Sequence, residues 1–442
     1  MRRYESYKDS GVEWLGEIPS HWECLPIRSI FKFRNEKNDP IKTDNILSLS
    51  IANGVTEYSD ENRGGNKRKD DLSSYKLAYP NDIVLNSMNV IVGAVGVSKY
   101  FGAISPVYYA LSLYNQRANL SYYESIFKNE NFQRGLLRFG KGILIKFGEN
   151  GKMNTIRMKI SQDDLKKLYF PIPPLDEQQK IAQFLDDKTA KIDQAVDLAE
   201  KQIALLKEHK QILIQNAVTR GLTPDVPLKD SGVEWIGQVP EHWEVKKLKY
   251  LAKLSPSKSE ITCNHEESCS FIPMEKLKLN TLVLDEIKQI KNVYSAYTYF
   301  RDEDLLIAKV TPCFENKNFA IAKNLVNSIG FGSSEIYVLR TYNNLLNKFL
   351  FYRLQEQNFM EIAISKMSGT GGLKRVPSEF INNFQLALPP FCEQQKIADY
   401  LDKQTAKIDQ AIALKTAHIE KLKEYKSVLI NDAVTGKVRV SV

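Results

Sequence analysis

Two short segments in the first half of this chain return, almost unchanged, in the second half. Residues 9–16 read DSGVEWLG and residues 230–237 read DSGVEWIG, while the six residues EQQKIA stand at 177–182 and again at 393–398. The two offsets, 221 and 216 residues, are nearly equal, so one large module occurs twice. A solenoid is excluded, because its units repeat many times with a period of about 20–50 residues. We expect two copies of a domain followed by a helix, a layout that suits a two-part target with fixed spacing.

Each copy ends in a segment that has the pattern of one long helix. Residues 176–219 contain no glycine or proline, and their apolar residues recur with a period close to 3.5. Residues 393–435 keep the same stripe; prolines precede both segments, and Gly221 and Gly436 follow them. Each stripe is too narrow to form a core alone, so we expect the two helices to bury each other as a coiled coil. The alternative is that each helix lies independently on its own domain.

The segments between the repeated motifs, about 20–172 and 240–388, have mixed α/β character. Each contains short apolar runs typical of strands, at 82–85, 304–308 and 335–339. Each then passes through a helical stretch, around 122–137 and 345–364, into a basic loop with glycines, at 139–143 and 368–375. The two segments share this order of elements, whereas their sequences diverge. The helices are therefore near-copies, whereas the globular parts are free to differ in what they bind.

Charge and composition favour a globular protein that contacts a polyanion. The chain has 442 residues and a formal net charge of +8, of which residues 1–172 carry +6. The N-terminal residues are polar, and no segment has the run of about 20 apolar residues that a membrane helix needs. We therefore expect a cytoplasmic location and no membrane partner.

Glycine-containing loops rich in Lys, Arg, Asn and Thr are the candidate nucleic-acid-binding elements. Glycine lets the backbone approach a ligand closely, Lys and Arg neutralise phosphates, and Asn, Thr and some Arg can read base edges. The candidates in the first module are Arg63, Lys67, Arg68, Lys69, Lys141, Lys146, Lys152 and Asn154. Those in the second are Lys309, Thr311, Asn316, Lys317, Lys366, Thr370, Lys374 and Arg375.

Signals for catalysis or for metal binding are weak. The chain has no GxxxxGK[ST] loop, no GxGxxG opening a βαβ unit, and no Asn-Pro-Pro-aromatic tetrapeptide of the adenine methyltransferases. Asp225 with residues 244–246 resembles a nuclease motif, but its position in a linker argues against that function. Five scattered cysteines, with Cys263 and Cys269 beside His265 as the nearest to a cluster, argue against a zinc site. For the duplicated His-Trp pairs at 21–22 and 242–243 we expect packing or hydrogen bonding rather than general-base chemistry.

The duplicated order of motifs resembles the specificity subunits of type I restriction-modification systems over nearly the full length. The resemblance rests on both DSGVEW(L/I)G segments with the following Pro-x-His-Trp, on both PPxxEQQKIA helix starts, and on the loops at 309–317 and 368–375. It implies an α+β fold with two target-recognition domains related by a pseudo-twofold axis, and two long antiparallel helices between them as a spacer. The resulting division is 1–172 for the first target-recognition domain, 173–221 for the first spacer helix, 222–388 for a linker and the second domain, 389–436 for the second helix, and 437–442 for a tail.

What the resemblance implies for function is a DNA-binding subunit with no catalytic, cofactor or metal site of its own. Such a subunit reads a bipartite sequence in double-stranded DNA and recruits two modification subunits, which methylate adenine N6. Two restriction subunits add translocation and cleavage. S-adenosylmethionine, ATP and Mg²⁺ would then belong to the partners. Two alternatives stay open from the residues alone: a standalone enzyme that modifies or cleaves DNA, and an adaptor whose coiled coil binds only protein.

Overall fold

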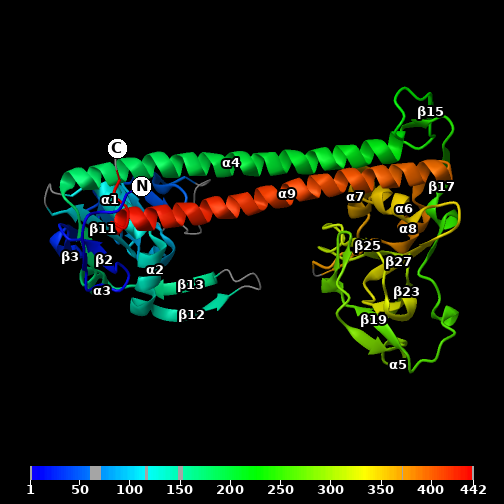
Figure 1. Cartoon of the computed structure of the whole chain (residues 1–442), viewed down its shortest axis with the longest axis horizontal. Coiled ribbons are helices and arrows are strands. Elements are labelled where there is room, and N and C mark those ends of the chain that lie inside the picture. Colours follow the sequence, from blue (N-terminus) through cyan, green and yellow to red (C-terminus); the bar gives the residue numbers. More distant parts are fainter. Residues whose placement is uncertain (1, 60–70, 115–117, 148–152, 371, 441–442) are drawn as a thin grey trace. The chain divides into compact units, whose positions relative to one another are not determined.

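The computed structural model describes residues 2–59, 71–114, 118–147, 153–370 and 372–440, without the side chains of 143–147 and 153–157. The chain forms two compact units. Unit 1 comprises Met1–Ala199 and Ala417–Val442, and unit 2 comprises Glu200–Thr416. Each unit therefore contains one globular part together with one half of each long helix (Figure 1). Among the described residues, no helix is long and apolar enough to cross a membrane.

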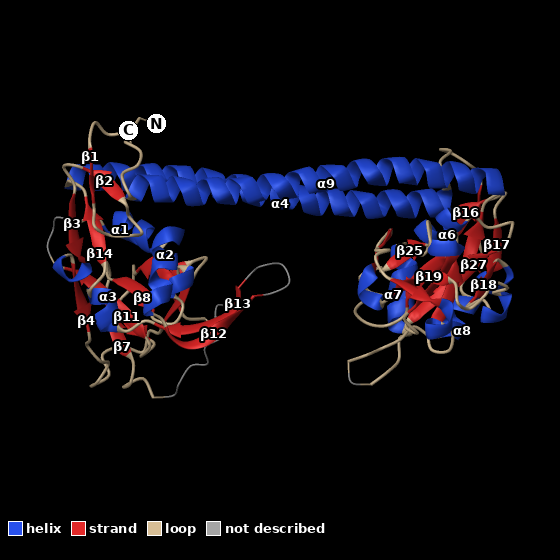
Figure 2. Ribbon diagram, turned by 60° about the horizontal axis from the view of Figure 1, so that its bottom comes forward, coloured by secondary structure: helices blue, strands red, loops and turns tan. Residues whose placement is uncertain are grey.

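The two long helices expected from the sequence are α4 (Leu175–Arg220) and α9 (Phe391–Val434), which lie side by side in Figures 1 and 2. They run antiparallel, because Asp193 of α4 pairs with Lys426 of α9 at 2.6 Å, whereas Lys210, further along α4, pairs with Asp409, earlier in α9, at 2.7 Å. In unit 1 the predicted stripe is buried in the core of the unit together with the end of α9. The prediction that the helices pack together is confirmed, and the alternative of two independent helices is wrong.

The globular part of unit 1 is built on an antiparallel sheet in the order β4-β11-β8-β9. Its strands are β4 (Phe31–Arg34), β8 (Ile83–Asn86), β9 (Val95–Val97) and β11 (Tyr108–Leu113). Helices α1 (Leu120–Phe127) and α2 (Glu130–Leu136) pack on it, and Asn119 and Asn129 cap their N-termini. The predicted helical stretch at 122–137 is thus two helices, because the side chain of Asn129 starts a second one. The other elements of unit 1 are β1 (Tyr7–Asp9), β2 (Glu17–Pro19), β3 (Glu23–Pro26), β5 (Leu47–Ser50), β6 (Gly54–Glu57), β7 (Lys76–Ala78), β10 (Gly102–Ile104), β12 (Lys141–Phe147), β13 (Met153–Lys159), α3 (Gln162–Lys166) and β14 (Tyr169–Ile172).

Unit 2 repeats this sheet and adds another. The repeated sheet has the order β18-β27-β24-β25, formed by β18 (Ala252–Leu254), β24 (Leu305–Ala308), β25 (Phe319–Ile321) and β27 (Ile336–Thr341). The added sheet has the order β22-β19-β26-β23, formed by β19 (Ser268–Ile272), β22 (Ile287–Gln289), β23 (Thr298–Arg301) and β26 (Ile329–Gly332). The predicted helix at 345–364 is again two, α6 (Asn347–Arg353) and α7 (Gln357–Ser365). The remaining elements are β15 (Leu228–Asp230), β16 (Gln238–Pro240), β17 (Glu244–Lys247), β20 (Leu277–Lys278), β21 (Thr281–Leu282), α5 (Ile290–Val293), α8 (Ser378–Asn383) and β28 (Gln385–Leu388).

The repeated DSGVEW segment forms the turn of a small hairpin, β1–β2 in unit 1 and β15–β16 in unit 2. The carboxylate of its first residue, Asp9, accepts a hydrogen bond from the backbone N–H of Gly11 at 3.0 Å, and Gly11 has φ +67°. A backbone in this left-handed region favours glycine. Asp230 and Gly232 repeat the arrangement at 2.9 Å. Turn geometry therefore explains why these residues are the same in both copies.

Candidate nucleic-acid interface

In unit 2 the two predicted basic loops are joined into one surface. The backbone N–H of Thr311 donates to the carbonyl of Lys374 at 3.0 Å, and the N–H of Lys374 donates to Oγ1 of Thr311 at the same distance. That hydroxyl donates in turn to the carbonyl of Gly372 at 3.0 Å, and isolated bridges link Val310 and Ser368 to Arg375. Segments more than 50 residues apart in sequence thus present Thr311, Thr370, Lys374 and Arg375 together.

Arg375 is oriented by a carboxylate that the sequence did not indicate. Its Nε and Nη2 atoms donate to the two carboxylate oxygens of Glu335, both at 2.9 Å. These hydrogen bonds lower the pKa of Glu335 and raise that of Arg375, so both groups stay charged. Glu335 directly precedes β27, and only the fold brings it to the loop. The guanidinium group of Arg375, held by these two hydrogen bonds, directs its remaining N–H donors in a fixed direction.

The other candidates of unit 2 differ in accessibility. Asn316, Lys366 and Thr370 are exposed, while Lys309 is partly buried with its ammonium group 5.3 Å from the centre of the Tyr337 ring. Lys317 is hydrogen-bonded within the fold: its ammonium group donates to the side chain of Gln211 and to the carbonyl of Gln355, both at 2.8 Å. Burial lowers its pKa. Lys317 therefore joins its loop to α4, and the accessible positive charge lies at Lys366, Lys374 and Arg375.

In unit 1 the candidate surface is the hairpin β12–β13, which stands out from the rest of its unit in Figures 1 and 2. Lys141 and Lys146 lie on β12 and Asn154 lies on β13. Lys141 faces Lys159 across the ladder, and both are exposed. Like charges in opposed positions repel, and an anion bound over them relieves this cost. Arg63, Lys67, Arg68, Lys69 and Lys152 lie outside the described residues.

Lys159 is a further basic residue that the sequence pattern alone did not single out. Residues 153–159 read MNTIRMK, and Lys159 is the last residue of β13. The basic residues spaced by two in this segment were the signal available in the sequence. Glu335, by contrast, had no local signal, because its partner lies 40 residues further along the chain.

The duplicated His-Trp pairs form the same hydrogen-bond network in both units. Glu177, in the first turn of α4, accepts from Trp22 Nε1 at 3.0 Å and lies 2.7 Å from His21 Nε2. Glu393, in the first turn of α9, repeats both contacts with Trp243 at 3.2 Å and His242 at 2.8 Å. The expected packing and hydrogen-bonding role is confirmed. These networks attach the start of each long helix to its hairpin.

The described residues hold no group of three or more His, Cys, Asp or Glu side chains arranged for a metal ion. His265 lies against the ring of Tyr294, with 4.5 Å between ring centres. Cys269 is buried, its thiol lies 3.3 Å from the carbonyl of Lys288, and burial raises its pKa to about 11. A thiol in this state is protonated at neutral pH and is a poor metal ligand.

Comparison with known proteins identifies the family. The model of the type I restriction modification DNA specificity domain matches residues 19–207 and 240–424. The EcoAI specificity subunit of Escherichia coli is 38% identical over 163 residues, which are 36% of this chain but only 27% of that protein. The putative MjaX specificity subunit of Methanocaldococcus jannaschii is 26% identical over 96% of both chains.

Solved structures share the fold over nearly the whole chain. One from a study of complex assembly and conformational transition of the type I R-M system has a TM-score of 0.66 at 14% identity, covering 95% of this chain and 99% of that one. The HsdS subunit of Thermoanaerobacter tengcongensis has a TM-score of 0.52 at 15% identity, covering 95% and 98%. With two matches to the family model, two similar globular parts and a shared pair of long helices, the chain belongs to the family of type I restriction-modification DNA specificity subunits.

Proposed function

We propose that this chain reads a bipartite sequence in double-stranded DNA, one half with each globular part, and does no chemistry itself. The observation that carries the proposal is the joined loop surface of unit 2, where Lys374 and Arg375 are held beside Thr311 by backbone hydrogen bonds. Exposed Lys and Arg neutralise phosphates and fix the register on the duplex, while hydroxyl and amide groups read base edges. A rigid loop pair holds both kinds of group in one orientation.

In unit 1 the corresponding element is a two-stranded ribbon. The major groove of B-DNA admits a ribbon of this kind, and residues that alternate along it point to one face. We assign phosphate contacts to Lys141 and to the added Lys159. Arg63, Lys67, Arg68, Lys69, Lys146, Lys152 and Asn154 stay candidates from the sequence. The two units thus use different surfaces, as two unlike half-sites require.

Partner recruitment is assigned to the long helices. In unit 2 the side chains of Leu205, Ile212 and Leu414 are 63%, 50% and 65% exposed, although all three are apolar. Leu205 and Ile212 are seven residues apart on α4 and so share one face, which suits the apolar seam of another helix. We propose that two modification subunits dock here and in the equivalent part of unit 1, and that two restriction subunits complete the assembly. S-adenosylmethionine, ATP and Mg²⁺ are then bound by these partners.

The test is a gel shift of the chain with its modification subunit on duplexes that carry the two half-sites at native and altered spacing. Methyladenine mapping in the host genome supplies the half-sites. We expect tight binding at one spacing and strong loss when a few base pairs are inserted between the half-sites. Equal binding at every spacing would count against a bipartite reader.

The two alternatives are separated by simpler assays. A standalone enzyme predicts turnover when the lone chain is incubated with DNA, Mg²⁺ and S-adenosylmethionine, whereas we expect none. An adaptor that binds only protein predicts that removal of both loop charges, Lys374 and Arg375, leaves DNA affinity unchanged.

A further inference from the structure

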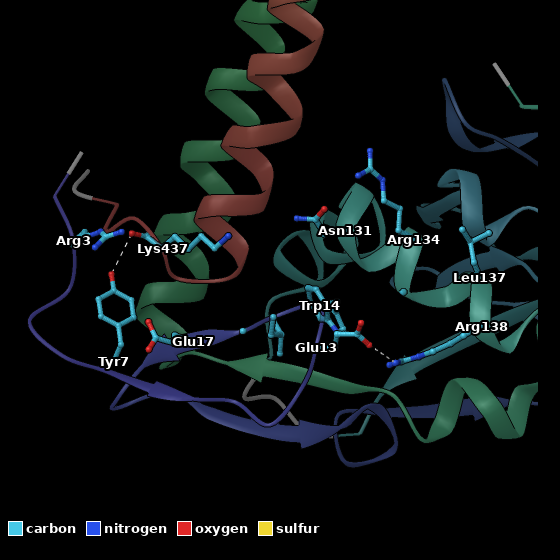
Figure 3. A pocket seen from close by; sticks show the side chains of 13 residues that line it. Arg3, Tyr7, Glu13, Trp14, Glu17, Asn131, Arg134, Leu137, Arg138 and Lys437 are labelled. Atoms are coloured by element: carbon cyan, nitrogen blue, oxygen red, sulfur yellow. Dashed lines mark hydrogen bonds and ion pairs between the residues drawn. The ribbon is translucent and has the colours of Figure 1, made fainter. Parts of the chain in front are cut away.

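Unit 1 contains a half-open groove of about 770 Å³ that the DNA-reading surfaces do not use. Four segments line it: the N-terminus with Arg3, the hairpin turn with Glu13 and Trp14, α2 and the turn after it with Arg134 and Arg138, and the tail after α9 with Lys437 (Figure 3). We call it the cationic groove. Its size is within the range of about 300–1,000 Å³ typical of ligand sites.

The groove gathers more positive charge than its own carboxylates neutralise. Arg3, Arg134, Arg138 and Lys437 line it, against the two carboxylates Glu13 and Glu17. Arg138 forms an ion pair with Glu13 at 2.8 Å, whereas the pair of Arg134 with Glu130 is longer, at 3.8 Å, and largely exposed. No ion pair of Arg3 or Lys437 is found among the described residues. Like charges drawn together in this way favour a bound anion.

Unit 2 has a hairpin and helices like those of unit 1, but it lacks these four positive charges. The N–H of Asn119 donates to Gln178, and that of Leu346 donates to Gln394, which aligns α2 with α7 and places Glu361 opposite Arg134. By the same alignment Ser365 stands for Arg138 and Ile362 for Gly135. The repeat of the hairpin, with its offset of 221 residues, places Pro224 at Arg3. The glycines after the two long helices, Gly221 and Gly436, both lie beside the buried tryptophan and place Leu222 at Lys437. All four cations are therefore absent from unit 2, although its hairpin turn keeps Glu234 and Trp235.

The tryptophan of the turn also differs in its surroundings. In unit 2 the ring of Trp235 is covered by Phe384, stacked at 4.5 Å, and by the buried guanidinium of Arg353 at 5.6 Å. In unit 1 Trp14 packs edge-on against Phe132 at 5.1 Å and lines the groove, and the α2 residue beside it is Gly135, which has no side chain. The indole N–H of Trp14 has no hydrogen-bond partner among the described residues. At the position of Gly135, unit 2 has the side chain of Ile362.

The arrangement of the charges favours an extended ligand. Figure 3 shows Arg3 and Lys437 at one side of the groove, Arg134 and Arg138 at the other, and Trp14 between them. Past Asn131 and Arg134 a second hollow of about 550 Å³ continues along the side of α9. Its lining is mixed in charge, with the lysines Lys421 and Lys423 and the carboxylates Glu130, Glu420 and Glu424. A compact anion would meet only one pair of cations. An extended chain with carboxylates at both ends and an apolar residue in the middle meets both pairs and the indole.

We propose that the cationic groove binds an acidic peptide segment of one partner subunit. The proposal rests on the proposed function, since the partner is a subunit of that assembly. Because unit 2 lacks the four cations, the segment anchors only the partner on unit 1, and two otherwise equivalent partners become distinguishable.

The test uses the full chain and a fluorescein-labelled dodecapeptide with Asp and Glu at both ends and Leu and Phe in the middle. Its control replaces every carboxylate by the corresponding amide. The test variant takes the residues of unit 2, Arg134→Glu with Arg138→Ser. The matched variant, Lys249→Glu with Lys229→Ser, changes the net charge equally on exposed residues of unit 2. Lys437→Ala, at an exposed tail residue, serves as a second test variant if the first one folds poorly.

By fluorescence anisotropy we expect the acidic peptide to bind at least about tenfold more tightly than its amide control, and the test variants to lose about tenfold in affinity while the matched variant keeps it. Equal binding of the two peptides, or no loss in the test variants, would overturn the proposal. So would tight binding of ATP that displaces the peptide, because this would indicate a site for a compact anion. DNA binding by the unaltered chain separates the two proposals: if the unaltered chain binds DNA but not the acidic peptide, only the groove assignment is wrong.

Discussion

Removal of Glu177 should destabilise unit 1 more than removal of Glu393 destabilises unit 2. Glu177 accepts hydrogen bonds from the fully buried Trp22 and from the hydroxyl of Tyr4, at 3.0 and 2.9 Å, and also contacts His21. Glu393 has the tryptophan and histidine contacts, but Asp225 stands where the tyrosine would be. A buried indole N–H left unpaired costs about 1–3 kcal/mol, and a further hydrogen bond about 1 kcal/mol.

We therefore expect Glu177→Ala to lower the free energy of unfolding by about 3 kcal/mol and Glu393→Ala by about 2 kcal/mol. For a unit of this size 1 kcal/mol shifts the melting temperature by about 2–4 °C, so the first variant should melt roughly 10 °C lower. Thermal and urea unfolding followed by circular dichroism measure both changes, with Glu208→Ala on the exposed face of α4 as the control. Equal losses in the two variants, or a loss no larger than that of the control, would refute the reasoning.

The same carboxylate predicts a pH dependence. Burial opposes ionisation of Glu177, but hydrogen bonds from Trp22, His21 and Tyr4 outweigh it, and the net pKa is lowered. A carboxyl whose pKa is lower in the folded state stabilises the fold above its unfolded pKa, near 4.3, and this contribution is lost as the pH falls through the folded value. The wild type should thus lose stability below about pH 4.5 more steeply than Glu177→Gln. Parallel pH profiles for the two proteins would contradict the assignment.

Three further sets of variants test individual parts of the structure. Lys317→Ala should lower the free energy of unfolding by about 1–3 kcal/mol, because the two acceptors of Lys317 lose their donor; urea unfolding measures this change. Unchanged stability together with reduced DNA affinity would instead indicate that Lys317 contacts DNA. Lys374→Ala with Arg375→Ala should weaken DNA binding and reduce the slope of log affinity against log salt by about 1 for each phosphate that is no longer neutralised, measured by salt titration. Gly221→Ala should lower the stability of unit 2 more than Gly232→Ala does. Both glycines have positive φ, but a Cβ at Gly221 would lie 2.8 Å from a carboxylate oxygen, whereas a Cβ at Gly232 would meet nothing within 4 Å. Gly232→Ala should cost only the backbone penalty of about 1–2 kcal/mol, and equal melting temperatures would contradict this.

Elements with a strong periodic signal were predicted well. Both long helices were found from their stripe and from the glycines that end them, and the apolar runs at 82–85, 304–308 and 335–339 correspond to β8, β24 and β27. The two shorter helical stretches were each predicted as one helix and are each two. The break depends on a single residue at the joint, such as the capping Asn129, and apolar periodicity does not show it.

The candidate DNA-binding residues were predicted only as loops, and which of them are accessible was decided by contacts distant in sequence. Lys317 and Lys374 look alike in the sequence, yet the first is occupied by Gln211 and Gln355 and the second is exposed. No local pattern distinguishes them, because the partners of Lys317 lie in another helix and another loop. The residue-level assignment of DNA contacts stays a prediction.

The sequence by itself determined the duplication, the long helices and the family, because these depend on local periodicity and on motifs that reappear in order. Tertiary structure decided which surface each unit presents: a joined loop pair fixed by Thr311 and Glu335 in unit 2, and a basic hairpin with a separate cationic groove in unit 1. The physical reason is that charge and hydrogen-bonding capacity act through distances in space. Arg3, Arg134 and Lys437 become one site only when the N-terminus, α2 and the tail meet.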